Sequence, residues 1–499
     1  MINSMRDIIY ANHSHYRIPN YTLGDAPALE EHLTRVTRIA YGKRKFYKSE
    51  IYYHYDEDSH DFYVPRGYDS VILANETGRY VTTCLSCNPY TVCRYQIKLP
   101  PLNDFQREAI RFLTGQEEYE WTKKHSQLVL SIPTRSGKTY CTIVAGSVLE
   151  KKLLIIVKSI ELRNQWVGDI KEYTGLSDAH IKVLDSSATI DRVAALSEKK
   201  LAEICIFLVN FQTLHSYIKR KGMQALNDAV AAMGVGVKVY DEAHKEFRNI
   251  LQIDYALNIW KTFYITATFG RSDYVEDIIF QRCFDKVAKI KKRDETKRRH
   301  THYLAIAYNA YADDWTKGEI FHGTTFNRFR YIEYEINAGV LLDKLEWLLV
   351  HLVVEKQLEG RILILSSSKW SCDQFYEFVH ALLPAYSACV HYDGNKTENF
   401  RDYGIICATP QMLGTGMTIP KLRIIINTEP TSSSINVVQY FGRLAEYAPD
   451  LDTYYVELFN KAYDKMMKWY RIRKNALKML AKTELLVDTT IIKNKKKEK

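Results

Sequence analysis

A short loop between an apolar run and a helix-like run carries residues that can bind phosphate. The apolar run covers residues 128–130, the loop covers 131–139, and the helix-like run continues to Glu150. A helix N-terminus presents backbone N–H groups to anions, while a Lys can contact phosphate oxygens and a hydroxyl can bind Mg²⁺. Lys138 and Thr139 occupy those two positions. The loop therefore predicts a nucleotide site, and an ordinary strand-to-helix turn is the alternative.

The loop departs from the strict phosphate-binding pattern at two positions. That pattern places Gly six residues before the Lys, where this chain has Ile132, and Arg135 stands in place of a loop glycine. The rest of the loop keeps the small and hydroxyl residues that let backbone approach phosphate. The candidate nucleotide contacts in this loop are Thr134, Arg135, Ser136, Gly137, Lys138 and Thr139.

Two adjacent carboxylates follow a second apolar run, residues 237–240, further along the chain. Hydrolysis of Mg²⁺-bound ATP needs one carboxylate to hold the metal and another to orient and deprotonate the attacking water. We assign Asp241 to the metal, together with Thr139, and Glu242 to the water. A strand that ends in Asp-Glu by chance is the alternative.

Composition restricts the class of protein. The 499 residues are too many for one average domain, and 46% hydrophobic with 26% charged residues indicates a soluble globular protein with several cores. A net charge of +10 favours a polyanion as partner, although solubility alone explains many basic surfaces. Nine Cys without paired spacing predict a reducing compartment, and no apolar run reaches membrane length. We therefore expect a cytoplasmic protein without secretion or membrane insertion.

Residues 1–96 are rich in Tyr and His and contain short alternating runs, which predict a small β-rich or α+β accessory domain. Within it, Cys84, Cys87 and Cys93 form a C-x₂-C-x₅-C cluster. Zinc usually takes four Cys or His ligands, and a distant His54 or His60 would have to complete the set. Reduced cysteines in a hairpin are the favoured interpretation, and zinc binding stays open.

From about residue 97 the chain alternates apolar runs with amphipathic helices, which is typical of parallel α/β units. A basic connector, residues 286–299, separates two series of such runs. A basic helix, residues 463–482, and a lysine tail, 493–499, follow, and we expect the tail to be disordered. The predicted strands cover residues 128–130, 153–157, 204–209, 237–240 and 263–266, then 304–308, 362–365, 405–407, 424–427 and 453–458.

The segment Asp241-Glu242-Ala243-His244, after a loop that ends Gly-Lys-Thr, resembles motifs II and I of the superfamily 2 helicases and translocases. Several further motifs of that superfamily have counterparts here in the expected order. Segment 102–106 resembles the adenine-reading segment, with Gln106 as the base contact. Residues 155–159 with Gln165-Trp166 resemble motif Ia, residues 207–213 the next strand and loop, and 266–268 motif III.

In the second series, residues 362–368 resemble motif IV, 414–420 motif V and 439–443 motif VI. Two departures stand out. Thr418 replaces the Asp that is frequent in motif V, and Glu446 replaces the second Arg of motif VI, which commonly acts as an arginine finger. Arg443 must then act alone or with help, and three arginines are conceivable helpers, namely Arg423, Arg471 and Arg473.

The resemblance covers roughly residues 97–460 and implies two tandem RecA-like parallel-sheet domains that bind ATP and Mg²⁺ between them. With the flanking segments, the expected domains are residues 1–96 (accessory, nucleic-acid-binding), 97–288 (ATP-binding), 289–485 and a tail, 486–499. The resemblance implies catalytic roles for Lys138, Asp241, Glu242, Gln439 and Arg443, and nucleotide contacts by Gln106 and Gly416. It implies nucleic-acid contacts or coupling for Lys158, Gln165, Gln212, Thr266, Thr268, Ser366, Thr409 and Thr415.

The plan of the chain is most similar to phage UvsW-type branch-migration enzymes, which implies a monomer acting on forked or branched DNA in a host cytoplasm. RNA, a duplex translocase or transcription-release factor, and a binding module with weak ATPase activity are the alternatives. Basic residues of the connector and of helix 463–482 would contact phosphates, which makes binding salt-dependent. Trp469 and Tyr470 could stack on bases, but packing is the favoured interpretation.

Overall fold

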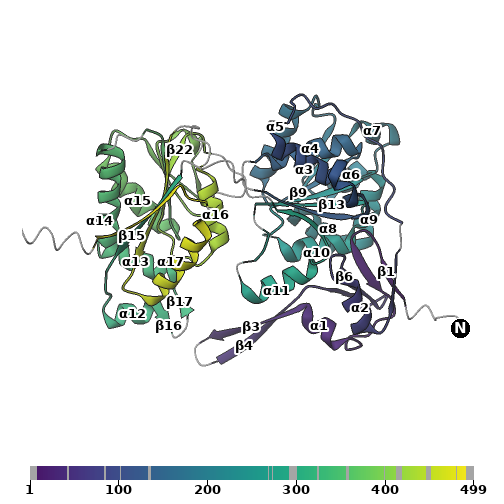
Figure 1. Cartoon of the computed structure of the whole chain (residues 1–499), viewed down its shortest axis with the longest axis horizontal. Helices are drawn as coiled ribbons and strands as arrows, with labels where there is room; N and C mark the ends of the chain where they lie inside the picture. Colours follow the sequence, from purple (N-terminus) through teal and green to yellow (C-terminus); the bar gives the residue numbers. More distant parts are fainter. Residues whose placement is uncertain are drawn as a thin grey trace, which may run out of the picture. The chain divides into compact units, whose positions relative to one another are not determined.

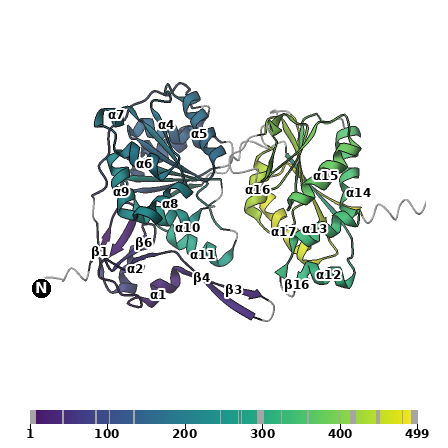
Figure 2. The ribbon, with the colours of Figure 1, turned by 180° about the vertical axis from the view of Figure 1, so that it is seen from behind.

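The computed structural model divides into two units, Met1–Arg293 and Asp294–Lys499 (Figures 1 and 2). None of the helices among the described residues is both long and apolar enough to cross a bilayer. The structure describes residues 8–41, 44–83, 86–101, 103–132, 136–244, 246–267, 269–271, 273–291, 301–322, 325–355, 359–397, 399–411, 419–444, 451–478 and 480–489.

The N-terminal region forms a five-stranded mixed sheet in the order β5-β6-β2-β1-β7, in which only the β1–β7 pair is parallel. A separate two-stranded antiparallel ribbon, β3–β4, extends from it. The elements are β1 (Ile8–Ala11), β2 (His15–Ile18), α1 (Pro27–His32), β3 (Thr34–Tyr41), β4 (Arg44–Ile51), β5 (His54–Asp56), β6 (Asp61–Pro65), α2 (Ser70–Thr77) and β7 (Tyr80–Thr83).

This N-terminal region shares a hydrophobic core with the rest of the first unit, since residues such as Ile9 and Phe62 pack in one cluster with Tyr240 and Phe280. A buried polar network crosses the same boundary. Lys238 Nζ lies 2.6 Å from Asp254 and donates to Ser14 Oγ at 2.9 Å. A buried charge is tolerated where it is paired and hydrogen-bonded. The N-terminal region is therefore built into the first unit.

A seven-stranded, all-parallel sheet forms the centre of the first unit, in the order β10-β11-β9-β12-β13-β8-β14. Helices lie on both faces of this sheet (Figure 1), and its inner strands are therefore almost continuously apolar. Its strands are β8 (Gln127–Ser131), β9 (Leu153–Val157), β10 (Ile181–Leu184), β11 (Ile206–Asn210), β12 (Val237–Asp241), β13 (Lys261–Thr266) and β14 (Ala288–Lys291). Its helices are α3 (Asp104–Thr114), η2 (Glu117–Lys124), α4 (Lys138–Leu149), α5 (Ile160–Tyr173), α6 (Ser187–Ala194), α7 (Glu198–Glu203), α8 (Phe211–Lys221), α9 (Met223–Ala232), α10 (Phe247–Ala256) and α11 (Tyr274–Cys283).

The second unit contains an eight-stranded sheet in the order β20-β19-β21-β18-β22-β23-β15-β24, parallel except for the β19–β20 hairpin. Its strands are β15 (Thr301–Tyr308), β18 (Arg361–Leu365), β19 (Ala388–Tyr392), β20 (Asn395–Lys396), β21 (Ile405–Ala408), β22 (Leu422–Asn427), β23 (Thr453–Asn460) and β24 (Thr483–Asp488); β16 (Phe321–His322) and β17 (Thr325–Phe326) pair separately. Its helices are α12 (Asp314–Ile320), α13 (Arg328–Asn337), α14 (Val340–Leu349), η3 (Val350–Glu355), α15 (Lys369–Leu382), η4 (Phe400–Asp402), α16 (Ser434–Gly442) and α17 (Asp464–Leu477).

This architecture confirms the predicted fold class of two RecA-like parallel-sheet domains with a small N-terminal sheet and a basic C-terminal helix. All ten predicted strands are present, whereas β10, β14, β19, β20 and β24 of the two large sheets were not predicted. These missed strands lie at or next to a sheet edge, and several alternate apolar with polar residues, as in Ala-Lys-Ile-Lys of β14. The predicted boundary at residues 288/289 falls inside β14, which pairs with β8 of the first sheet.

Helix α17 is shorter than the predicted basic helix, because the chain turns after Leu477 to enter the edge strand β24. Tyr470 stacks on Phe459 with ring centroids 4.5 Å apart, and Trp469 meets Phe326 edge-on at 5.2 Å. These contacts confirm packing as the role of both aromatics. Residues 292–300 of the connector and the tail 490–499 lie outside the described residues.

Candidate functional site

The carboxyl edge of the first sheet gathers the polar residues that were singled out in sequence. Neighbouring parallel strands end there at Asn210, Val157, Asp241, Thr266 and Ser131, in spatial order. Ligands of open parallel α/β sheets bind outside the carboxyl ends of the strands. The chain therefore places Lys138 and the carboxylates of Asp241 and Glu242 at the edge where such a site forms.

Helix α4 begins at Lys138 directly after Gly137, whose φ of 82° lies in the left-handed region that glycine favours. A Cβ at Gly137 would lie 2.4 Å from Nε2 of Gln106, so only glycine lets this amide approach the loop so closely. The predicted adenine contact is thus brought against the predicted phosphate loop. Ser136 and Thr139 flank the same helix start, whereas Thr134 and Arg135 lie outside the described residues.

Asp241 and Glu242 are both buried where β12 ends. The indole Nε1 of Trp166 on α5 donates to Asp241 Oδ2 at 2.9 Å, and the Glu242 N–H donates to Asp241 Oδ1 at 2.9 Å. Glu242 has a φ of 54°, a conformation that costs a residue with a side chain about 1 kcal/mol or more. Such strain is retained where surrounding contacts over-determine the backbone.

The electrostatics of this cluster link the lysine to both carboxylates. Burial lowers the pKa of Lys138, while the negative charges of Glu242 and Asp241 act to raise it. Burial raises the pKa of Asp241, and the neighbouring Glu242 raises it further, against the opposing effects of Trp166 and Lys138. A buried pair of carboxylates with one nearby ammonium is a site that gains by binding a cation.

His244 joins the carboxylate loop to the next strand. Its Nδ1 lies 2.7 Å from the Thr266 hydroxyl at the end of β13 and 3.4 Å from Glu242 Oε2. The carbonyl of His244 accepts a hydrogen bond from the Arg271 guanidinium. The predicted coupling residue Thr266 is thus in direct contact with the Asp-Glu-Ala-His segment, whereas Thr268 lies outside the described residues.

The cluster suits Mg²⁺-ATP. Lys138 and the N–H groups at the start of α4 would hold phosphate oxygens, Thr139 and Asp241 would hold the metal, and Gln106 would contact the base. Bound Mg²⁺ would supply charge neutralisation on the phosphates. The buried carboxylate pair beside Lys138, and the close approach of Gln106 to Gly137, are the observations that support this fit.

Three of the predicted nucleic-acid contacts lie close to the carboxyl ends of β9 and β11. Lys158 follows β9 and is half-exposed, with its ammonium 2.8 Å from Glu246. Gln165 on α5 and Gln212 on α8 are exposed. The structure thus leaves the two glutamines accessible and pairs the lysine with a carboxylate of the first unit.

The corresponding residues of the second unit lie directly after β21 and in the last turn of α16. Thr409 follows β21 and is buried, Gln439 is a buried residue of α16, and Arg443 caps the C-terminus of α16 and is partly exposed. Ser366 is fully buried and donates to Ser371 Oγ at 2.6 Å. A buried hydroxyl cannot contact nucleic acid directly in this conformation, so for Ser366 the prediction that stays is a coupling role. Thr415, Gly416, Thr418 and Glu446 lie outside the described residues.

Two of the arginines considered as helpers of Arg443 have structural roles instead. Arg473 is buried, and its guanidinium lies 2.8 Å from Glu457 on β23. Arg423 lies at the start of β22, far along the strand from its carboxyl end, and donates to the carbonyl of Asp452 at 2.5 Å. Neither guanidinium is available at the carboxyl edge, and Arg471 on α17 is exposed.

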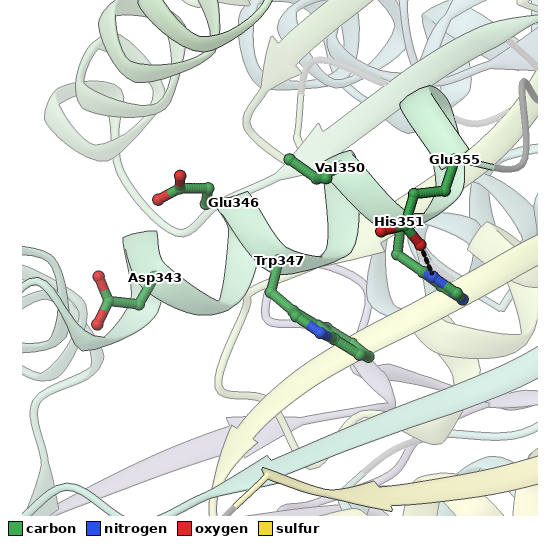
Figure 3. Close-up of a pocket in the computed structure, with 6 residues that line it drawn as sticks. All are labelled: Asp343, Glu346, Trp347, Val350, His351 and Glu355. Atoms are coloured by element: carbon green, nitrogen blue, oxygen red, sulfur yellow. Dashed lines mark hydrogen bonds and ion pairs between the residues drawn. The ribbon is translucent and has the colours of Figure 1, made fainter. Parts of the chain in front are cut away.

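A depression on the surface of the second unit lies over α14 and η3 (Figure 3). The His351 ring stacks on Trp347 at 5.7 Å, and its Nδ1 lies 2.7 Å from Glu355. The carboxylates that line this depression repel phosphate, and none of its lining residues belongs to the helicase-like motifs. We therefore do not assign nucleotide binding to the depression. The lining residues are Asp343, Glu346, Trp347, Val350, His351 and Glu355.

The predicted cysteine cluster lies only partly within the described residues. Cys93 is buried beside Cys205, which directly precedes β11, and Cys87 is a free thiol. Cys84 lies outside the described residues, and no group of three or more potential ligands that could hold a metal occurs in the part of the chain that the structure describes.

The sequence did not identify Trp166 and Arg271 as residues that contact the Asp-Glu-Ala-His segment. Trp166 appeared only as the neighbour of Gln165 in the segment that resembles motif Ia. Their partners are distant in sequence, as in the contact between Trp166 and Asp241. The only available signal for Trp166 was a single indole within an otherwise amphipathic helix, which is also typical of packing.

Comparison with known proteins gives a family match for the first unit. Residues 99–271 match the family described as "Type III restriction enzyme, res subunit". The comparison with curated proteins finds no match.

Among solved structures, the chain is similar to S. cerevisiae Dbp5 bound to RNA and ADP BeF3, with 12% identity and a TM-score of 0.50 over 79% of this chain and 91% of that chain. A variant of Dbp5 with the same bound molecules gives 12% identity and a TM-score of 0.51 over 79% and 92%. The helicase domain of Pyrococcus furiosus Hef gives 11% identity and a TM-score of 0.45 over 74% and 97%. The family match covers the candidate site of the first unit, and the similarity to Dbp5 shows a shared fold.

Proposed function

We propose that the protein is an ATP-dependent DNA helicase or translocase that remodels forked or branched DNA, as in branch migration, recombination or replication restart. The observation that carries this proposal is the cluster at the carboxyl edge of the first sheet. There Lys138 at the start of α4 interacts electrostatically with Asp241 and Glu242, and Gln106 packs against Gly137. A lysine, two carboxylates and a helix N-terminus are the groups that ATP hydrolysis requires.

In this proposal the chain's residues divide the work of hydrolysis. Lys138 and the α4 amides bind and orient the phosphates, Asp241 with Thr139 holds Mg²⁺, and Glu242 takes the proton of the attacking water. Arg443 and Gln439 of the second unit act on the same nucleotide, with Arg443 stabilising charge on the terminal phosphate. Thr266, which contacts His244, couples hydrolysis to movement of the second unit.

Nucleic acid as the partner is supported by the net charge of +10 and by the exposed glutamines at the carboxyl edge. The choice of DNA depends on the similarity of the chain's plan to UvsW-type enzymes. RNA is the second candidate, and the observation that favours it is the shared fold with Dbp5, which was solved bound to RNA.

The first experiment measures phosphate release in the presence of single-stranded DNA, forked DNA, a four-way junction or single-stranded RNA. We expect the largest stimulation with forked or four-way DNA. A stimulation that is largest with RNA would transfer the proposal to an RNA helicase. The Lys138→Ala variant provides the blank, since it removes the phosphate-binding ammonium. Equal rates with and without every nucleic acid would refute the proposed function.

A second experiment separates unwinding from translocation. Strand displacement on forked DNA is measured beside triplex displacement, which a duplex translocase performs without separating the strands of the duplex. Activity in both assays supports a helicase. Triplex displacement alone supports the duplex translocase or transcription-release alternative.

A further inference from the structure

The β3–β4 ribbon is an isolated two-stranded element that extends beyond the body of the first unit (Figures 1 and 2). Its eight paired positions run from Thr34↔Ile51 to Tyr41↔Arg44. A two-stranded ribbon is marginally stable by itself, so its persistence depends on how its base is attached. Val36 and Tyr47 are 57% and 69% exposed, although ribbons in soluble proteins usually limit exposed apolar surface.

The two strands are strongly basic. Their sequences contain five basic residues and a single acidic one, Glu50, which is engaged by Arg35 at 3.1 Å. A basic antiparallel ribbon with exposed aromatic and apolar side chains has the chemistry that recognises a nucleic-acid backbone and its bases. The basic residues are Arg35, Arg38, Arg44, Lys45 and Lys48.

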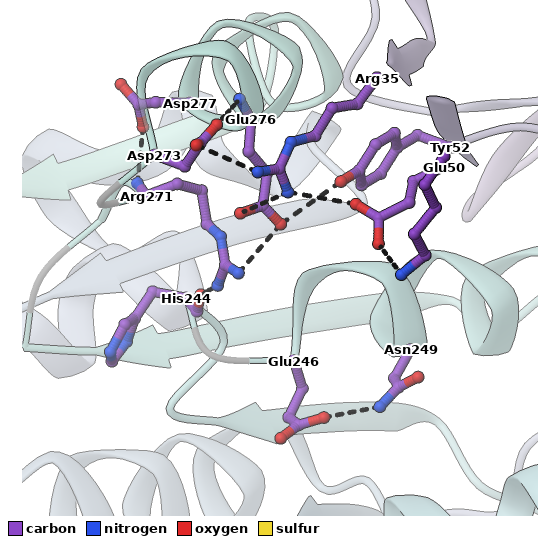
Figure 4. Close-up of polar contacts among 11 residues, drawn as sticks. Arg35, Glu50, Tyr52, His244, Glu246, Asn249, Arg271, Asp273, Glu276 and Asp277 are labelled. Atoms are coloured by element: carbon purple, nitrogen blue, oxygen red, sulfur yellow. Dashed lines mark hydrogen bonds and ion pairs between the residues drawn. The ribbon is translucent and has the colours of Figure 1, made fainter. Parts of the chain in front are cut away.

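The base of the ribbon is fastened to α11 by charged contacts (Figure 4). Arg35 on β3 lies 3.0 Å from Asp273, which caps the N-terminus of α11, and 3.9 Å from Glu276 in its first turn. Tyr52, just after β4, donates to Glu276 at 3.4 Å. Asp273 and Glu276 are thus the residues of α11 and its cap that bind the base of the ribbon.

The start of α11 is also linked, through Arg271, to the Asp-Glu-Ala-His segment of the candidate ATP site (Figure 4). Arg271 lies 2.9 Å from Glu276, and its backbone N–H donates to Asp277 at 2.6 Å. The other end of the Arg271 guanidinium donates to the carbonyl of His244. Glu276 is therefore shared between the ribbon's arginine and the arginine that fixes the Asp-Glu-Ala-His segment.

We propose that the β3–β4 ribbon binds the phosphate backbone of the nucleic acid, and that Arg35 transmits its position through Glu276 and Arg271 to the segment that carries Glu242. This inference rests on the proposed function and adds a binding arm and a route of regulation to it. Arg35 and Arg271 act as positioning residues, since they reach the reacting groups only through His244.

The physical basis is that one carboxylate contacts both guanidinium groups, Arg271 at Oε1 and Arg35 at Oε2. Two guanidinium groups share Glu276, so a displacement of Arg35 changes the charge-assisted bond that Arg271 makes with it. Because Glu242 lies two residues before His244 in a left-handed conformation, a small shift of the His244 carbonyl reorients the catalytic carboxylate. Coupling between two sites is a free energy that mutation of the connecting groups should reduce.

The binding arm is tested with the triple variant Arg38→Ala/Lys45→Ala/Lys48→Ala in the full chain. Affinities for fluorescent forked DNA, single-stranded DNA and RNA of equal length are measured over a series of salt concentrations. We expect weaker binding and a log Kd–log salt slope that falls by about 2, because each lost phosphate contact removes roughly 0.7–0.9 from it. A matched variant of three exposed lysines elsewhere, Lys182→Ala/Lys199→Ala/Lys200→Ala, should keep the wild-type slope. Equal slopes for the two triple variants would refute the binding arm.

The route to the ATP site is tested with Arg35→Ala and Asp273→Asn. The asparagine keeps the helix cap and removes only the charge, which guards against a folding defect. We expect the ratio of nucleic-acid-stimulated to basal kcat to fall about 5- to 10-fold in both variants, and Arg35→Lys to restore part of it. Arg17→Ala, which breaks the 3.0 Å pair with Asp61 in the N-terminal sheet, is the matched control.

The outcomes separate this inference from the proposed function. Wild-type protein without any stimulation by nucleic acid would refute the proposed function itself. A stimulated wild type, with Arg35→Ala and Asp273→Asn stimulated to the same degree, would refute the route through Glu276 and leave the proposed function intact. A loss in Arg17→Ala equal to that in Arg35→Ala would also refute it, because the effect would then be a general weakening of the N-terminal region.

Discussion

The two parallel sheets of this protein have similar topology and different chemistry at their carboxyl edges. In the first, the edge combines a lysine with two buried carboxylates, whose charges act on its pKa, and a histidine that lies 3.4 Å from Glu242. In the second, Thr428 donates to the carbonyl of Leu365 at 2.8 Å, and the single buried carboxylate after β22, Glu429, lies 3.4 Å from Arg328. The comparison shows that a duplicated scaffold need not carry duplicated chemistry. In the proposed function, the first unit supplies the hydrolytic groups and the second unit supplies Arg443.

Buried ion pairs show a second contrast. In the first unit, Lys238 pairs with Asp254 inside a network that joins the N-terminal sheet to the central sheet. In the second, Arg473 pairs with Glu457 and fastens α17 to β23. Each pair lies inside one unit, and we assign a structural role to both. Burial of a charged side chain therefore does not by itself identify a catalytic residue.

The largest expected effect tests the chemistry of the first edge. Glu242→Gln should keep ATP binding and reduce stimulated phosphate release by about 10²- to 10⁴-fold, because an amide cannot accept the proton of the attacking water. Steady-state phosphate release and nucleotide affinity are measured on the same preparation. Glu198→Gln, an exposed residue of α7, is the control. Near-normal turnover in Glu242→Gln would show that the carboxyl edge of the first sheet does not carry the hydrolytic chemistry assigned to it.

Arg443→Ala tests whether the second unit contributes to the same reaction. We expect kcat to fall about 10³-fold, the lower end of the range for an arginine finger, with little change in ATP affinity. The control is Arg471→Ala, which removes an exposed guanidinium from α17. If Arg443→Ala turns over like the wild type, the hydrolytic groups belong to the first unit alone.

The structural assignment of Arg473 predicts a defect in stability. Arg473→Ala leaves Glu457 buried without its partner, which typically costs about 3–5 kcal/mol. Urea unfolding followed by Trp fluorescence should show an earlier transition for the second unit. Arg471→Ala, with its guanidinium in solvent, should unfold like the wild type. If Arg473→Ala is as stable as the wild type but impaired in hydrolysis, Arg473 would instead be assigned to assist Arg443 in catalysis.

The smallest effect concerns pH and a carboxyl group in the core of the second unit. Burial raises the pKa of Glu335 on α13 from 4.5 to about 7, against opposing hydrogen bonds. Between pH 4.5 and 7 the Glu335 carboxyl is therefore protonated in the folded state and ionised in the unfolded state. The free energy of unfolding should decrease as the pH rises through this range. The loss should amount to roughly 2–3 kcal/mol and be complete above the folded-state pKa.

Urea unfolding at pH 5 and pH 8 measures this loss, and Glu335→Gln should reduce the difference between the two pH values. Glu333→Gln, on the exposed side of the same helix, should leave the difference unchanged. An identical pH dependence in Glu335→Gln and the wild type would exclude Glu335 as its source.

Much of the fold could be predicted because inner strands of parallel sheets are covered on both faces and read as continuous apolar runs. Residues 153–157 were predicted with the bounds that β9 has. Edge strands such as β14 and β24 are less covered by apolar side chains on one side. They contain polar residues and are therefore not recognised as apolar runs in the sequence. The candidate site could be predicted where a motif is local in sequence, as at Gly137-Lys138-Thr139 and at Asp241-Glu242.

The sequence by itself determined the phosphate loop, the carboxylate pair and the repetition of α/β units, since each depends on neighbouring residues and on the period of apolar side chains. Only the tertiary structure decided that Trp166 holds Asp241, that Arg473 is a buried partner of Glu457, and that Arg35 and Arg271 share Glu276. These contacts join residues from separate elements. A contact of that kind is fixed by how helices and strands pack, and charge or spacing along the chain does not specify it.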